Sequence, residues 1–164
     1  MIQDTIKSLA STYFEEYRSI RHHLHANPEL SFKEFETSKF VQAQLTSIGI
    51  PFSILGETGV IGIIKGNPSN RVIALRADMD ALPIHEENKV SYASTKDGVM
   101  HACGHDVHIT SLVGTARIMA STRDTWTGTL MLIGQPAEER INGASGMMED
   151  GIWERFGQPD YALA

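Results

Sequence analysis

Short apolar runs separated by glycine- and proline-containing turns constrain the fold of this chain more than any other feature. Three of these runs cover residues 51–55, 60–65 and 72–77. They are rich in Ile, Val and Leu, which is typical of β-strands. Residues 56–59 and 66–70 supply the turns between them. A fourth run, at residues 129–134, has the same character and predicts another buried strand.

Segments with the period of an α-helix alternate with these strands. In residues 2–24 apolar side chains recur at spacings of three and four, and Pro28 ends the pattern. A second helix is predicted to begin at Ser31, with Glu34 completing a capping box, and to end at Gly49 as its C-terminal cap.

Two more helices are expected in the second half of the chain. One begins near His105, and the other covers residues 143–156. With 164 residues the chain suits a single domain. The loose alternation of helices and strands predicts an α/β fold, a layered sheet with flanking helices.

Composition excludes several classes of protein. Fourteen Lys and Arg against twenty Asp and Glu give a net charge of −6, which argues against a nucleic-acid partner. The single cysteine excludes an internal disulfide framework. The apolar runs are too short to cross a bilayer, and acidic residues interrupt the N-terminus where a signal peptide would be apolar. We therefore expect no membrane partner and a cytoplasmic location.

Polar side chains of metal-binding types gather in three segments beside these elements. The segments are residues 77–83, 101–108 and 135–139, and together they supply Asp, Cys, His and Glu. All four residue types bind divalent metal ions. Functional sites of α/β proteins form where strands give way to loops, so we expect the three segments to share a site.

Cys103 and His105 are separated by one glycine and can turn toward one point if the backbone there is not regular helix. A thiolate and an imidazole suit zinc or a similar borderline ion. A buried structural cysteine beside a histidine at a helix start would give the same pattern. The pair alone leaves both interpretations open.

Glu138 and Glu139 follow directly on an apolar strand. Paired acidic residues usually form a solvated face, but neighbouring side chains diverge here. One carboxylate can therefore bind a metal while the other faces a water molecule. Metal-assisted hydrolysis needs this separation of Lewis acid and general base.

Asp80 is placed to accept a hydrogen bond from a ligand imidazole and fix its tautomer. Asp78 and Asp80 can instead satisfy loop amides at the strand end, so the roles of both stay open. His108, one turn after His105, is expected to pack at the helix start. The other histidines are expected to be structural or solvated: His22, His23, His25, His85 and His101.

Four segments in this order resemble a known family. They are RHHLHANPELS at residues 21–31, the aspartate segment at 77–83, HACGHDVH at 101–108 and QPAEE at 135–139. Together they resemble the amidohydrolase branch of the co-catalytic metallopeptidases, which includes aminoacylases, hippurate hydrolases and auxin-conjugate hydrolases. The resemblance implies a zinc-exopeptidase-like catalytic domain.

The resemblance also assigns roles to individual residues. It implies that Cys103, His105 and Glu139 bind a divalent transition metal (Zn, Mn, Co or Ni). It also implies that Glu138 is the general base and that Asp80 supports the metal ligands without binding the metal itself. The implied reaction is hydrolysis of the amide bond of an N-acyl or N-aroyl amino acid by a metal-activated water.

Family members are more than twice as long as this chain, so residues 1–164 correspond to the N-terminal part of the catalytic domain, without the lid domain. Relatives hold two ions, but three ligands suit one ion or none. A catalytically inactive fragment that folds and binds at most one ion is therefore an alternative, and a hydrolase with Cys103 as nucleophile is a third. Missing strands also predict self-association or pairing with the C-terminal part.

Overall fold

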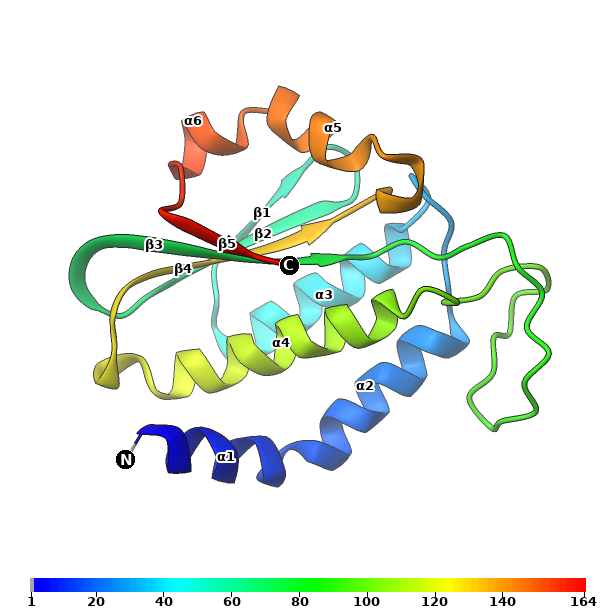
Figure 1. Cartoon of the computed structure of the whole chain (residues 1–164), viewed down its shortest axis with the longest axis horizontal. Helices are drawn as coiled ribbons and strands as arrows, with labels where there is room; N and C mark the ends of the chain where they lie inside the picture. Colours follow the sequence, from blue (N-terminus) through cyan, green and yellow to red (C-terminus); the bar gives the residue numbers. More distant parts are fainter. Residues whose placement is uncertain (1) are drawn as a thin grey trace.

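A five-stranded sheet runs through the centre of the molecule in the order β1-β2-β4-β3-β5 (Figure 1). The structure is a computed structural model that describes residues 2–164. The strands are β1 Phe52–Leu55, β2 Gly59–Lys65, β3 Asn67–Asp78, β4 Thr127–Gln135 and β5 Tyr161–Leu163. β1 and β2 pair antiparallel, as do β2 and β4, whereas β3 runs parallel to both β4 and β5.

The parallel pair of β3 and β4 fixes where polar side chains can meet. Asp78 at the end of β3 lies opposite Gln135 at the end of β4. Both strands therefore end at the same edge of the sheet. Functional sites of α/β proteins lie at this edge, formed by the carboxyl ends of the parallel strands.

Helices cover both faces of the sheet (Figure 1). The helices are α1 Ile2–Thr12, α2 Phe14–Ala26, α3 Phe35–Ile48, α4 His105–Ser121, α5 Gly143–Glu149 and α6 Ile152–Phe156, with 3-10 turns η1 Arg123–Thr125 and η2 Glu138–Arg140. One apolar core lies between the sheet and α2, α3 and α4, and a second lies beneath α5 and α6. The predicted α/β layered fold is confirmed.

The predicted first helix is wrong in its continuity. It divides at Tyr13 into α1 and α2. No residue of α1 is buried, whereas Ile20 and Leu24 of α2 lie in the core. The apolar stripe is therefore used only in its second half, because α1 lies farther from the sheet (Figure 1).

The predicted capping box is also wrong. α3 begins at Phe35 rather than Ser31, and Glu34, which occupies its N-cap position, makes no side-chain capping hydrogen bond. Both side chains instead bind groups distant in the sequence, Ser31 to Asp80 and Glu34 to Thr58 and the amide of Ala137. The C-terminal cap at Gly49 is confirmed, with a φ of 74° that favours glycine.

Two other boundaries differ from the prediction. Residues 67–70, expected in a turn, already belong to β3, where a register shift separates Asn67 from Val72. The helix expected at residues 143–156 is interrupted at Gly151, which has a φ of 77° and divides it into α5 and α6. Across residues 2–164, no helix is both long and apolar enough for a membrane span.

Candidate metal centre

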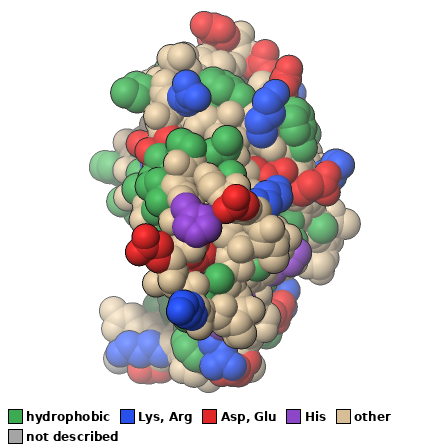
Figure 2. Space-filling view, turned by 90° about the vertical axis from the view of Figure 1, so that its right-hand side faces the viewer, with side chains coloured by type: hydrophobic (Ala, Val, Ile, Leu, Met, Phe, Trp, Pro, Cys, Tyr) green, Lys and Arg blue, Asp and Glu red, His purple; other side chains and the backbone are tan. Residues whose placement is uncertain are grey.

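The end of β3, the loop before α4 and the turn after β4 meet at one edge of the sheet. On the face of the molecule at this edge, histidine and acidic side chains lie beside one another near the middle of the view (Figure 2). Nε2 of His105 lies 3.8 Å from Oε1 of Glu139, and Asp80 accepts the amide of Glu138, so the convergence expected for the three polar segments is present in the fold.

Cys103, His105 and Glu139 offer three ligand atoms that all lie within 4.8 Å of one another. His105 is buried, and Cys103 is exposed. Oε1 of Glu139 is buried without any hydrogen-bond partner within residues 2–164. A buried, unpaired carboxylate oxygen is costly unless a cation or donor satisfies it. Sulfur, nitrogen and oxygen donors at this spacing therefore fit a divalent transition metal.

The main chain of Asp80 orients the imidazole of His105. Nδ1 of His105 lies 2.8 Å from the backbone oxygen of Asp80 and 3.4 Å from its Oδ1. Nδ1 therefore carries the proton donated to that oxygen, and Nε2 is the ring nitrogen left to bind a metal ion. This nitrogen faces the acidic pair, 3.8 Å from Oε1 of Glu139 and 3.9 Å from Oε2 of Glu138.

The carboxylate of Asp80 anchors the acidic pair through the main chain. It accepts hydrogen bonds from the amides of Glu138 and Glu139, both at 3.0 Å, and from the hydroxyl of Ser31 at 2.6 Å. Burial favours the neutral acid, but hydrogen bonds from His105, Ser31 and the two amides lower the pKa of Asp80 to about 2. Asp80 therefore stays ionised and organises the site without pointing its own oxygens at a metal.

Negative charge dominates the electrostatics around the donors. Burial opposes protonation of His105, but Asp80 and Asp78 raise its pKa. Partial burial of the sulfur and the carboxylates of Glu139 and Glu138 raise the pKa of the Cys103 thiol. A site with this excess of negative charge is suited to a cation, and displacement of protons would accompany its binding.

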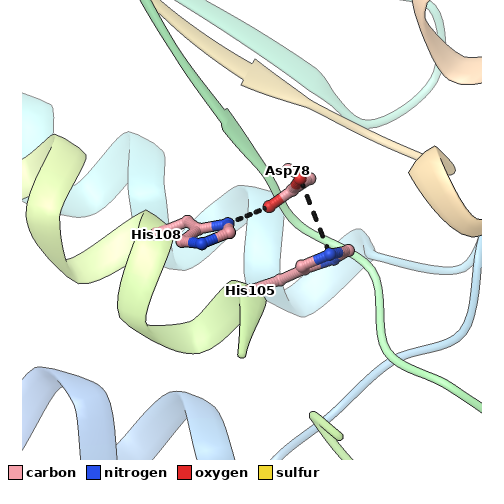
Figure 3. A group of neighbouring side chains, drawn as sticks. All are labelled: Asp78, His105 and His108. Carbon is pink, nitrogen blue, oxygen red and sulfur yellow. Dashed lines mark hydrogen bonds and ion pairs between the residues drawn. The ribbon is translucent and has the colours of Figure 1, made fainter. Parts of the chain in front are cut away.

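A second group, Asp78, His105 and His108, lies beside the first and shares His105 with it (Figure 3). Nδ1 of His108 lies 2.6 Å from Oδ1 of Asp78, and Nε2 of His105 lies 3.5 Å from Oδ2. The expectation that His108 packs at the helix start is wrong, since 53% of its side chain is exposed. Asp78 also pairs with the guanidinium of Arg76 at 2.8 Å, which already neutralises it. The first group is therefore the better cation site.

Sequence reasoning did not single out the pairing of Asp78 with His108, although a signal was present. His108 follows His105 by three residues and so shares its helix face, and Asp78 precedes Asp80 by two residues at a strand end. These two spacings together place the four side chains in one region.

The other histidines lie outside both groups. His25 is buried between Asp106 at 2.7 Å and Glu86 at 3.1 Å, in agreement with a structural role. His101 is buried, and burial lowers its pKa to about 4. His22 stacks on Tyr92, His23 stacks on Phe40, and His85 pairs with Asp97 on the surface.

Two proteins of known activity are similar in sequence to this chain. The chain is 48% identical over 149 residues to a hippurate hydrolase of Campylobacter jejuni, covering 90% of this chain and 38% of that protein. It is 44% identical to an N-acyl-L-amino acid amidohydrolase of Geobacillus stearothermophilus, covering 94% and 42%. The chain thus spans about two fifths of the length of these relatives.

A solved structure has the same fold. The YXEP protein of Bacillus subtilis, described as a dinuclear metal binding peptidase from the M20 family, superposes with a TM-score of 0.84 at 43% identity, covering 87% of this chain and 41% of that one. The model of peptidase family M20/M25/M40 matches residues 74–164, which is more than half of the chain. The matched region contains all the side chains of the two candidate metal-binding groups. The chain therefore belongs to peptidase family M20/M25/M40.

Proposed function

We propose that this chain carries the metal-binding and acid–base residues of an amidohydrolase that cleaves the amide bond of N-acyl or N-aroyl amino acids. The observation that carries the proposal is the meeting of Cys103, His105 and Glu139 within 4.8 Å, with Glu138 beside them. The names of relatives that act on hippurate and on N-acyl-L-amino acids support the substrate class.

Each residue of the site has a distinct part in this proposal. Cys103, His105 and Glu139 would hold a divalent ion, which supplies Lewis acidity for the substrate carbonyl and the attacking water. Glu138, with 41% of its side chain exposed, would take the proton from that water and deliver it to the leaving amine. Asp80 would keep Nε2 of His105 directed at the donors.

Metal content and turnover test the proposal together. We expect the chain to bind Zn²⁺ or Co²⁺, and Glu138→Gln to keep the bound metal while abolishing any hydrolysis of an N-acetyl amino acid. Cys103→Ala and His105→Ala should each lower the metal stoichiometry. Unchanged stoichiometry in both variants would refute their assignment as ligands.

A second candidate is a chain that binds one ion and turns nothing over. It is favoured by the three-donor set and by the share of the relatives' length that the chain spans. Metal binding without turnover would support it, whereas turnover that chelator abolishes and Mn²⁺ or Zn²⁺ restores would contradict it.

A cysteine nucleophile is the least favoured mechanism. The raised pKa of Cys103 keeps its sulfur protonated, whereas nucleophilic cysteines need a lowered pKa. Chelator-insensitive activity that thiol alkylation blocks would reverse this judgement.

An apolar hollow lies beside β5 and is lined in part by Ala74, Met147 and Trp153. For partners, we propose that β5 and this hollow pack against further protein, either a second copy of the chain or a segment equivalent to the part of the relatives that the chain does not match. Leu163 and Tyr161 of β5 are more than half exposed.

A further inference from the structure

The turn that presents Glu138 and Glu139 has an unusual backbone. Ala137, the residue before the pair, has a φ of 49° and is completely buried. A residue with a Cβ is disfavoured in this left-handed conformation by about 1 kcal/mol. Surrounding contacts must therefore hold the turn, and strain of this kind concentrates at functional sites.

Glu34 supplies the first of these contacts from a distant part of the sequence. Its side chain is completely buried, and its Oε1 accepts the amide of Ala137 at 2.8 Å. The same carboxylate accepts the amide of Phe32 at 3.0 Å and the hydroxyl of Thr58 at 3.0 Å. All three partners donate to the carboxylate, but burial outweighs these hydrogen bonds and raises the pKa of Glu34.

Asp80 supplies the other two contacts. Its oxygens accept the amides of Glu138 and Glu139 at 3.0 Å each. Three successive amides, those of residues 137–139, thus bind two buried carboxylates, Glu34 and Asp80, that lie far apart in the sequence. This arrangement determines where the main chain leaves the turn and hence where both acidic side chains start.

We infer that Glu34 is a positioning residue of the metal centre: by binding the amide of Ala137 it holds the turn that directs Glu139 toward Cys103 and His105. The inference rests on the proposed metal site and deepens it. Glu34 itself does not ligate, because its oxygens face the turn, Phe32 and Thr58. Its effect on the metal is exerted through Glu139.

Binding of Co²⁺ to the purified chain tests this role, with Glu34→Ala as the main variant. Removal of groups that orient ligands typically weakens metal affinity by about 10- to 100-fold, and we expect at least a tenfold loss. Glu34→Gln should stay within about threefold of the wild type, because its amide oxygen still accepts from Ala137 and the Thr58 hydroxyl can reverse to accept. The absorption band of cobalt bound to the Cys103 sulfur should persist in both.

Glu29 offers a matched control in the same segment. It is a nearly buried carboxylate that accepts the amide and the hydroxyl of Thr37 at 2.8 and 2.9 Å. Glu29→Ala therefore removes similar hydrogen bonds without touching the turn. We expect it to lower stability but to leave Co²⁺ affinity within about twofold. An equal loss of affinity in Glu29→Ala and Glu34→Ala would overturn the inference.

A double-mutant cycle separates positioning from general destabilisation. In a Glu139→Gln background, Glu34→Ala should weaken Co²⁺ binding by less than about twofold, because the ligand that it positions is already impaired. A tenfold loss that persists in this background would contradict the inference. If Glu34→Ala does not fold, Glu34→Asp takes its place, since its shorter side chain cannot reach Ala137; unchanged affinity in that variant would be equally contradictory.

The outcomes distinguish this inference from the proposal beneath it. A wild-type chain that binds no Co²⁺ would overturn the metal site and the role of Glu34 together. A wild type that binds Co²⁺, with Glu34→Ala binding it equally tightly, would overturn the role of Glu34 alone.

Discussion

Two borders of the sheet differ in chemistry: the polar edge, formed by the ends of β3 and β4, and the β5 edge, formed by the last strand of the sheet. At the edge where β3 and β4 end, buried polar groups bind one another through short hydrogen bonds, as Asp80 and Glu34 do with the turn at residues 137–139. At the outer edge, β5 presents exposed apolar side chains beside a hollow of about 260 Å³ with an almost entirely apolar lining.

The difference shows that the two edges depend on different parts of the protein. The polar edge is held by hydrogen bonds from Ser31 to Asp80 and from the turn after β4 to Glu34 and Asp80. The β5 edge has one neighbour, β3, and leaves Leu163 62% exposed. We therefore expect substitutions at the polar edge to change stability and metal affinity, and substitutions at β5 to change association.

The largest effect on stability is expected from Gly143→Ala, which introduces a steric clash at the polar edge. A Cβ on Gly143 would lie 1.6 Å from the carbonyl oxygen of Pro136, so the turn must shift. We expect a loss of about 3 kcal/mol in the free energy of unfolding, measured by chemical denaturation, and weaker Co²⁺ binding.

The matched control for this prediction lies in the same helix. A Cβ on Gly146 would meet nothing within 4 Å, so Gly146→Ala should be neutral or stabilise the helix by up to about 1 kcal/mol. Equal stability of the two variants would show that the turn is not closely packed on α5.

A smaller effect, dependent on pH, is expected from Asp80→Asn. The pKa of Asp80 is lowered to about 2 from an ordinary value near 3.8, so its ionised form stabilises the fold above pH 4. This contribution is lost as the pH falls from about 4 to 2 and amounts to about 2 kcal/mol at neutral pH.

Stability curves of wild type and variant test this sign. In the metal-free chain the difference in free energy of unfolding should be largest near pH 7 and shrink steadily between pH 4 and 2. Asp97→Asn, at a side chain that is 91% exposed, serves as the control and should show little change. A difference that grows in acid would refute the assignment.

Local patterns in the sequence predicted those features that neighbouring residues decide. The strands at residues 60–65 and 129–134 and the cap at Gly49 follow from composition and glycine chemistry, which act over a few residues. The position of the polar segments at strand ends predicted that they would share a site, and the family resemblance named Cys103, His105 and Glu139 as its ligands.

The prediction failed where distant groups compete for the same side chain. Ser31 and Glu34 have the spacing of a capping box, but Asp80 and Ala137 bind them more than forty residues away. Local spacing cannot reveal such partners, because a capping box and a long-range anchor use the same residue types. His108 was misassigned for the same reason, since its partner Asp78 lies on β3.

The smallest effect on stability, and the clearest on association, is expected at β5. Leu163→Lys places a charge on an exposed edge strand. The charge opposes pairing with the edge strand of a second copy and reduces the exposed apolar surface that such a copy could bury. Because Leu163 is 62% exposed, the free energy of unfolding should change by no more than about 0.5 kcal/mol. Sedimentation velocity at increasing concentration should show less self-association than the wild type. Phe14→Lys, at an exposed apolar residue on α2, is the control. If that variant reduces association and Leu163→Lys does not, the helical layer rather than the sheet edge mediates self-contact, and the contrast between the two edges fails.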